Sequence, residues 1–262
     1  MHILLSNDDG VLAPGLVALA KALSTIAKVT VMAPESERSG YSSALTLDRP
    51  LRPIQLDNGF WSVNGTPADC VYLALNGFFA DDEPDFVVTG INSGANLGDD
   101  VIYSGTVGAA LEGRFLGKPA LAVSLAGPKV KQHTSVDAFA VAAELVVDLV
   151  SHWHDLALPE HNIINMNVPD IPANQIKGFR LTQLGKRQRG LSIQKSHDPR
   201  QRPVYWIGLM GKPVACEHET DFQAIEQGYV SLTPLQTDLT SHEALPTLQN
   251  WFQAHAKSRN FN

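Results

Sequence analysis

Cysteine is nearly absent from this sequence, since only Cys70 and Cys216 occur among its 262 residues. Two cysteines are too few for a secreted disulfide framework or for a zinc site built on thiolates. We therefore expect both to be buried free thiols in a reducing compartment, which favours the cytoplasm.

Long apolar runs are also missing. No stretch approaches the roughly 18 apolar residues of a membrane span. The apolar run at residues 3–5 is shorter than the core of a signal peptide and has no basic leader before it. The sequence therefore predicts a soluble, cytoplasmic protein without a membrane partner.

Basic residues are not in excess, because 20 Lys and Arg stand against 27 Asp and Glu, a net charge of −7. This balance argues against a nucleic-acid duplex as partner, but it is compatible with a small anionic ligand at a local site. A hydrophobic content of 44% is that of a globular protein.

Strand-like and helix-like segments alternate along the first part of the chain. The pattern predicts strands at 3–6, 29–33, 85–91 and 120–124, with helices at 14–27, 106–116 and 135–152. Strands that are apolar on both faces are typical of a parallel sheet covered by helices. We therefore predict a three-layer α/β/α, Rossmann-like fold with a mostly parallel sheet. Residues 1–160 form the predicted catalytic core, and residues 161–262 a C-terminal elaboration that ends in a helix.

A projecting β-hairpin is expected within that elaboration, at about residues 191–208. Two alternating segments, 191–195 and 203–208, flank the turn residues 197–200. Tyr205 and Trp206 could fold back onto their own domain or pack on a neighbouring subunit, and the sequence favours neither.

Polar residues follow three of the predicted strands, where an open α/β sheet binds its ligands. Carboxylate, hydroxyl and amide oxygens suit Mg²⁺ or Mn²⁺ better than zinc. The alternative is a simple turn in which an aspartate caps the next helix. The candidate oxygen donors after the three strands are Asp8 and Asp9, Ser36 and Ser39, and Asn92 and Asn96.

A small turn, Ser104-Gly105-Thr106, leads into the predicted helix at 106–116. The N-terminus of a helix offers unpaired N–H groups to an anion, so this turn is a candidate phosphate cradle. Helix capping by Ser104 or Thr106 is the alternative. Residues 113–119 resemble a phosphate loop, but their glycine spacing and Pro119 exclude a Walker A motif.

Five motifs, in order over residues 1 to about 125, closely resemble the SurE (survival protein E) family of nucleotidases. They are ILLSNDDG at 3–10, Ala33-Pro34 followed by Ser39-Gly40, NGTPADCV at 64–71, GINSGANLG at 90–98 and YSGT at 103–106. The hairpin at 191–208 is similar to the exchanged arm of that family. The resemblance implies a cytoplasmic homodimer or homotetramer.

The same resemblance implies a metal-dependent phosphomonoesterase acting on 5′- and 3′-nucleoside monophosphates, with polyphosphate as a further substrate of some members. Asp8, Asp9, Ser39 and Asn92 then look like ligands of one Mg²⁺ or Mn²⁺ per subunit, and Asn96, Ser104, Gly105 and Thr106 like phosphate contacts. Asp9 is the candidate for orienting the attacking water, although the choice between Asp8 and Asp9 rests on the resemblance alone.

Two other classes of function are open. A nucleotide-binding or sensing protein would hold the same ligand without hydrolysing it. A purely structural assembly protein would account for the hairpin, but it leaves the polar strand ends unexplained.

Overall fold

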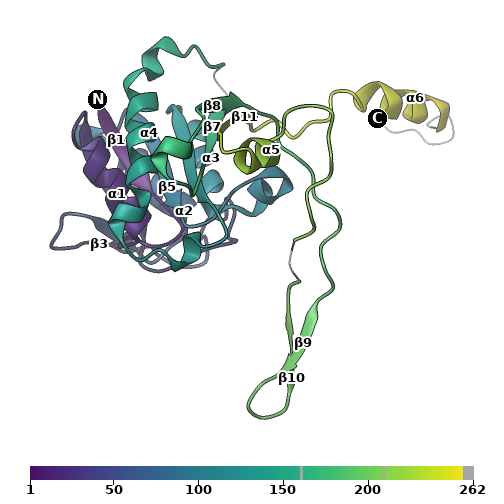
Figure 1. Cartoon of the computed structure of the whole chain (residues 1–262), viewed down its shortest axis with the longest axis horizontal. Coiled ribbons are helices and arrows are strands. Elements are labelled where there is room, and N and C mark those ends of the chain that lie inside the picture. The colour runs from purple at the N-terminus through teal and green to yellow at the C-terminus, as the bar shows by residue number, and fades with distance from the viewer. Residues whose placement is uncertain (160–161, 209, 256–262) are drawn as a thin grey trace.

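β1 (His2–Ser6) and β5 (Phe86–Asn92) lie side by side in the middle of a nine-stranded sheet (Figure 1). The computed structural model describes residues 1–159, 162–208 and 210–255. The strand order is β3-β4-β2-β1-β5-β6-β7-β11-β8. The other strands are β2 (Lys28–Pro34), β3 (Pro53–Gln55), β4 (Trp61–Val63), β6 (Ala120–Ala126), β7 (Asn162–Pro169), β8 (Phe179–Leu181), β9 (Gln194–His197), β10 (Pro203–Trp206) and β11 (Val230–Gln236).

The predicted fold class is confirmed. The five central strands β2-β1-β5-β6-β7 pair in parallel, whereas β3–β4 and β7–β11 are antiparallel pairs. Strands β7, β8 and β11 belong to the same sheet although they follow residue 160. No helix in the described ranges is long and apolar enough to cross a bilayer.

Helices cover both faces of the sheet, and each face has its own apolar core. α1 and α4 pack on one face, and α2 and α3 pack on the other. The helices are α1 (Pro14–Leu23), α2 (Pro67–Leu73), α3 (Gly105–Phe115), α4 (Ala140–Ser151), α5 (Asp221–Glu226) and α6 (Leu245–His255). Single turns of other helix types occur at Ala74–Phe78, Ala80–Asp82, Gly98–Tyr103, Val130–Gln132, Val136–Phe139, Trp153–Asp155 and Ala173–Gln175.

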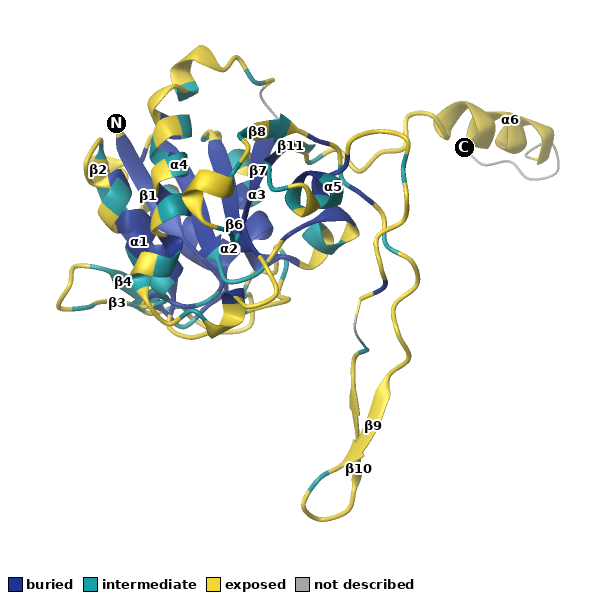
Figure 2. Ribbon diagram, viewed as in Figure 1, coloured by how far each residue is buried: buried dark blue, intermediate teal, exposed yellow. Residues whose placement is uncertain are grey.

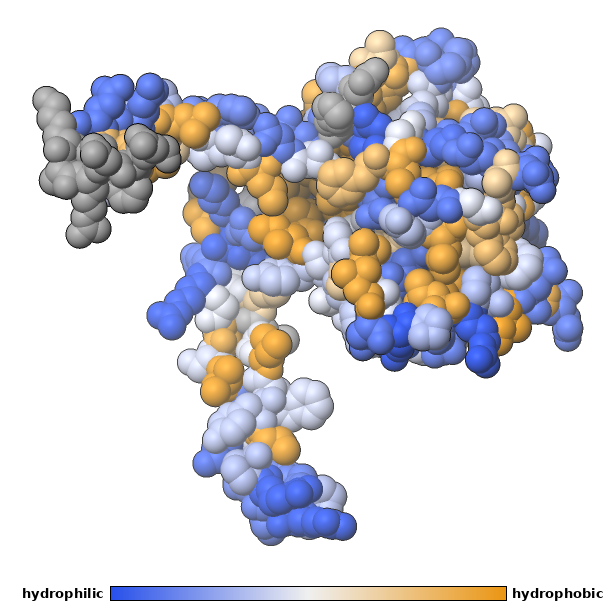
Figure 3. Space-filling model, turned by 180° about the vertical axis from the view of Figure 1, so that it is seen from behind, coloured by the Kyte–Doolittle hydropathy of each residue, from blue (hydrophilic) through white to orange (hydrophobic). Residues whose placement is uncertain are grey.

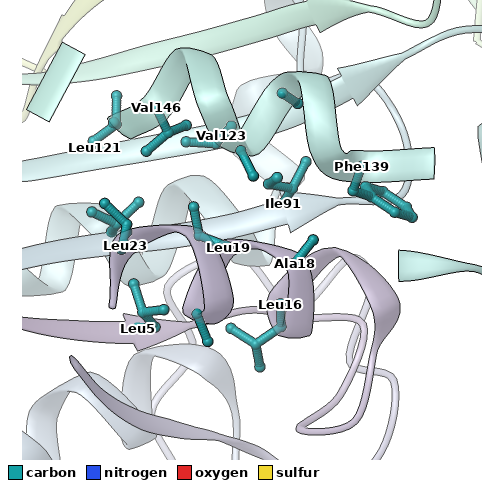
Figure 4. Close-up of a cluster of buried hydrophobic side chains, with 14 of the residues drawn as sticks. Leu5, Leu16, Ala18, Leu19, Leu23, Ile91, Leu121, Val123, Phe139 and Val146 are labelled. Carbon is teal, nitrogen blue, oxygen red and sulfur yellow. The ribbon is translucent and has the colours of Figure 1, made fainter. Parts of the chain in front are cut away.

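The core under α1 follows directly from the spacing of its leucines. Leu16, Leu19 and Leu23 recur at helical intervals, and all three are fully buried. Figure 4 shows them facing side chains of the sheet and of the α4 region, which include Leu5, Ile91, Leu121, Val123, Phe139 and Val146. The helix predicted over 135–152 becomes α helix only at Ala140, because residues 136–139 form a tighter 3₁₀ turn.

The sheet reverses its direction of growth between β1 and β5. From β1 the chain crosses to β2 on one side, and from β5 it proceeds to β6 and β7 on the other. The crevice beyond the carboxyl ends of two such strands is the usual ligand site of open α/β sheets. The loops after β1 and β5 therefore occupy the position where a ligand is expected.

The hairpin is present and projects away from the sheet, with β9 and β10 exposed along their whole length (Figure 2). Tyr205 and Trp206 are exposed, so folding back onto their own domain is excluded. The strands differ slightly from the prediction because Asp198 closes the turn by accepting hydrogen bonds from the Arg200 and Arg202 N–H groups, and His197 then pairs with Pro203.

Both cysteines are free thiols. Cys70 is buried as expected, whereas Cys216 is only half-buried. The expectation that both lie in the interior is therefore wrong for Cys216, which belongs to an irregular segment between β10 and α5.

We predict that Leu19→Ala lowers the free energy of unfolding by about 2–5 kcal/mol, because it leaves a cavity in a fully buried site. Leu47→Ala is the matched control, since Leu47 is 89% exposed, and it should change stability by less than about 0.5 kcal/mol. Urea unfolding of both variants provides the measurement. Equal losses in the two variants would contradict this account of the core.

Candidate active site

Asn7 builds the tight turn that follows β1. Its Nδ2 donates to Gly10 O (3.0 Å), and the Gly10 N–H donates to Asn7 Oδ1 (3.2 Å). Gly10 has a φ of +107°, which favours glycine. The residue preceding α1 is Ala13, which makes no side-chain cap. The alternative in which Asp8 or Asp9 caps the next helix is therefore wrong, and both carboxylates are used elsewhere.

Asp8 lies against the first turn of α3. The Thr106 hydroxyl donates to Asp8 Oδ1. A Cβ atom added to Gly105 would lie only 2.9 Å from Asp8 Cβ and 3.0 Å from Asp8 Oδ2, so this approach requires glycine. The N-terminus of a helix carries partial positive charge and attracts a carboxylate. Asp8 thus joins the end of β1 to the start of α3.

Asp9 reaches across to the loop after β5. The Ser93 N–H donates to Asp9 Oδ2 at 2.8 Å. The preceding residue, Asn92, ends β5, and its Nδ2 donates to Gly94 O at 2.8 Å. The two loops at the switch point are therefore held together, and Asp8, Asp9 and Asn92 lie at the same edge of the sheet.

The two aspartates share an environment that disfavours negative charge. Burial raises the pKa of Asp8 to about 6; the Thr106 hydrogen bond opposes the rise and the charge of Asp9 adds to it. Burial also raises the pKa of Asp9, and the Ser93 hydrogen bond partly offsets it. Glu37 raises the pKa of Asp9 further, whereas Lys131 lowers it. A divalent cation between such carboxylates would relieve both the repulsion and the loss of solvation.

Ser39 lies in the exposed loop that follows β2. Within that loop the Arg38 N–H donates to Asp8 O at 2.7 Å, so the loop runs next to the aspartates. The Ser39 hydroxyl itself donates to Glu37 Oε1 at 2.8 Å. Its place among the metal ligands stays a prediction.

The start of α3 has the features of a helix terminus that can receive an anion. Ser104 is its N-cap, and its Oγ accepts from the Val107 N–H at 3.1 Å, so the capping role is confirmed. The first hydrogen bond of the helix is donated by Gly108 to Ser104 O. The N–H groups of Gly105 and Thr106 lie ahead of that bond, where a helix can bind phosphate. The Thr106 hydroxyl is occupied by Asp8.

Asn96 is the least exposed of the predicted polar residues in the 92–98 loop, at 7%. Its Nδ2 donates to Ser124 Oγ at 2.7 Å, and its backbone is bonded to Asn165 and Asn167 of β7. Sequence reasoning missed these three partners. The available signal was the polar pair Asn165 and Asn167 at alternating positions among the apolar residues of β7.

Asp221 is a further residue that sequence reasoning missed. This fully buried aspartate accepts hydrogen bonds from the N–H groups of Gly98 (2.6 Å) and Gly185 (2.9 Å). It thereby fixes the end of the 92–98 loop to the segment that leads into the hairpin. No spacing in the sequence connects residue 221 with residue 98.

In the described residues no cluster of three or more His, Cys, Asp or Glu side chains occurs. The candidate ligand set instead combines two carboxylates with a hydroxyl and an amide, and these are the oxygen donors that Mg²⁺ and Mn²⁺ prefer. The fold and the site together define a doubly wound α/β protein with an acidic strand end set against the N-terminus of a helix.

The chain belongs to the SurE family, because the family model described as Survival protein SurE matches residues 3–190. It is 56% identical over 255 residues to the 5′-nucleotidase SurE of Acinetobacter baumannii strain AYE, covering 95% of this chain and 98% of that protein. The 5′-nucleotidase SurE of Methylococcus capsulatus is 53% identical over 251 residues, covering 96% and 97%.

A solved structure gives the same result. The crystal structure of the SurE protein from Aquifex aeolicus superposes with a TM-score of 0.82 at 38% identity. The match covers 96% of this chain and 99% of that chain. The resemblance carried by the five sequence motifs is therefore confirmed over nearly the whole length.

We predict that Asp8→Asn stabilises the metal-free protein at neutral pH. The folded state holds the Asp8 proton more tightly than the unfolded chain does. Protonated Asp8 therefore contributes its full stabilisation of the fold below pH 3.8, and this contribution is lost as the pH rises through about 6. Asparagine is uncharged at every pH and so avoids this loss, and its side-chain oxygen can still accept the hydrogen bond from the Thr106 hydroxyl. The gain should reach about 1–3 kcal/mol at pH 8 and vanish near pH 4.

Urea unfolding in the presence of chelator, at pH 8 and near pH 4, measures this difference. Asp57→Asn is the control, because Asp57 is exposed. A loss of stability at pH 8 in the Asp8→Asn variant would show that the carboxylate contributes to folding rather than opposing it.

Proposed function

We propose that this protein is a metal-dependent phosphomonoesterase that hydrolyses 5′- and 3′-nucleoside monophosphates to nucleoside and phosphate. The observation that carries the proposal is the contact of the Asp8 carboxylate with Gly105 and Thr106 at the start of α3. It sets a site for a cation beside a site for an anion. The relatives named 5′-nucleotidase SurE support the substrate class.

The proposed cofactor is one Mg²⁺ or Mn²⁺ per subunit, held by Asp8, Asp9, Ser39 and Asn92. The fit rests on two adjacent carboxylates at the same edge of the sheet as the Asn92 amide, and burial raises the pKa of both, so that a cation beside them would offset the cost of burying their charge. When bound, such a cation supplies Lewis-acid polarisation of the phosphoryl group and a more acidic water.

The chain's own groups then divide the remaining work. The N–H groups of Gly105 and Thr106 receive the phosphoryl oxygens and stabilise the charge that develops on them. Asp9, which is more exposed than Asp8, orients the water for in-line attack and holds its proton. Asp8 is anchored by the Thr106 hydroxyl and keeps the two halves of the site in register.

A nucleotide sensor that does not hydrolyse its ligand is the alternative. Adjacent carboxylates oppose the binding of a phosphate unless a cation lies between them, and a cation beside a phosphate favours hydrolysis. The pair Asp8-Asp9 therefore favours the enzyme.

We predict that Asp9→Asn lowers the rate of phosphate release from nucleoside monophosphates by at least about 100-fold, because Asp9 is proposed both to bind the metal and to orient the attacking water. The assay uses a panel of 5′- and 3′-monophosphates with Mg²⁺ or Mn²⁺ present. Inorganic polyphosphate is included as a further proposed substrate of the same site.

Asp57→Asn serves as the control for this assay and should retain the rate of the wild type. An unchanged rate in Asp9→Asn would eliminate the proposed role of Asp9. Tight nucleotide binding by the wild type without release of phosphate, with either metal, would establish the sensor instead.

We further propose a homodimer or homotetramer in the cytoplasm, assembled through the hairpin arm. The arm and the residues beside it expose a row of apolar side chains, and Figure 3 shows orange side chains along this projection. The exposed side chains are the aliphatic Leu191, Ile193, Val204 and Ile207 and the aromatic Tyr205 and Trp206, all at least 36% exposed. Contiguous apolar surface of this kind is typical of subunit contacts.

Replacing residues 191–208 with a short glycine linker should therefore lower the assembly state while leaving the sheet folded. Light scattering coupled to size exclusion measures the mass, and circular dichroism checks the fold. An unchanged mass would remove the arm from the interface.

A further inference from the structure

Asn96 is held by side chains from two neighbouring strands, its backbone by β7 and its side chain by β6. Asn165 Nδ2 and Asn167 Nδ2 both donate to Asn96 O, at 2.9 and 3.0 Å. The Asn96 N–H donates to Asn167 Oδ1 at 2.9 Å, and Asn96 Nδ2 donates to Ser124 Oγ at 2.7 Å. We call Ser124, Asn165 and Asn167 the Asn96 clamp.

The clamp fixes Asn96 more completely than an ordinary loop residue. Asn167 acts on both peptide groups of Asn96, because it accepts from the N–H and donates to the carbonyl. Asn165 supplies a second donor to the same carbonyl oxygen. The fourth bond restricts the side-chain amide itself, so neither the backbone nor the side chain of Asn96 can rotate without breaking buried hydrogen bonds.

The residues of the clamp occupy buried positions where apolar side chains would be expected. Residues 163, 165 and 167 of β7 share the face toward α2 and α3, and Ile163 packs in the apolar cluster there. Asn165, Asn167 and Ser124 are all fully buried on that same face. A buried amide adds little to the stability of the fold even when it is hydrogen-bonded, and it destabilises the fold when it is not.

Part of that cost is visible, because within the described residues Asn165 Oδ1 is buried without a hydrogen-bond partner. Apolar side chains would serve a purely structural strand better. Polar groups that break the local pattern are characteristic of functional sites. Their benefit must therefore lie in what they hold, which is a residue of the proposed phosphate site.

We propose that Asn165 and Asn167 are positioning residues for the reaction, which fix the backbone of Asn96 and so the place from which Asn96 contacts the phosphate. The inference rests on the proposed function, in which Asn96 contacts the phosphoryl group. Neither residue touches the substrate, and both act through Asn96. Displacement of such a contact by about 1 Å lowers rates on the order of 100-fold.

The test compares Asn167→Ala with Ser231→Ala in the full chain. Ser231 is the direct neighbour of Asn167 across β7 and β11, is equally buried, and bonds to Thr182 rather than to Asn96. We expect Asn167→Ala to lower kcat/KM for a nucleoside monophosphate by about 10- to 100-fold and to weaken inhibition by inorganic phosphate. Ser231→Ala should remain within about twofold of the wild type.

Two further measurements separate positioning from general loosening. Mn²⁺ affinity, measured by calorimetry, should be unchanged in Asn167→Ala, because Asp8 and Asp9 are intact. Asn165→Ala keeps both bonds from Asn167, so it should fold as the wild type does and lose a smaller part of kcat/KM, about 3- to 10-fold. This variant carries the test if Asn167→Ala does not fold.

Values of kcat/KM within twofold of the wild type in both asparagine variants, or equal losses in Ser231→Ala, would overturn the proposal. Failure of the proposed function is distinguishable, since the wild type would then release no phosphate from any nucleotide. In that case calorimetric binding of inorganic phosphate tests the clamp, and Asn167→Ala must bind it more weakly than Ser231→Ala for the inference to stand.

Discussion

The arrangement of the site depends on one interaction, the contact between the buried Asp8 side chain and the N-terminus of α3. It joins the first strand of the chain to a helix nearly 100 residues later. The Thr106 hydroxyl donates to the Asp8 carboxylate, and Gly105 allows the close approach because it has no side chain. The helix terminus attracts the carboxylate, while burial and the neighbouring Asp9 oppose its charge. Without a ligand this edge of the sheet carries more negative charge than its surroundings favour. A cation would offset this charge and so allow a phosphate to bind at the start of α3, and the chemistry proposed for the protein follows from that pairing.

The surrounding elements hold this edge in place. Ser93 holds Asp9, the strands β6 and β7 hold Asn96, and Asp221 holds Gly98 from the far end of the chain. The bonds to Asn96 and Gly98 are made to buried residues, so the part of the loop that carries the predicted phosphate contact belongs to the packed interior. Buried polar groups stabilise the fold less than apolar side chains would. Such a loss of stability is typical of functional sites, where the positions of the side chains matter more.

Much of this fold could be predicted from the sequence, because apolar runs and helical spacing are local. The strands at β1, β2, β5 and β6 and the leucines of α1 follow from that pattern alone. The adjacency of the Asp8-Asp9 and Asn92 loops also followed, since parallel strands bring their carboxyl ends to one edge. What could not be predicted depends on contacts between distant residues. The capping alternative failed because Asn7 closes the turn, and Asp221 and the Asn96 clamp appear only once the strand order is known.

The central claim is that a cation at the paired aspartates allows this site to hydrolyse a nucleotide. The most direct test is phosphate release from a nucleoside monophosphate by chelator-stripped protein as Mn²⁺ or Mg²⁺ is added back. The account predicts negligible release without metal and restored release that saturates at one ion per subunit. Undiminished release in chelator, or none with either ion from fully folded protein, would contradict it.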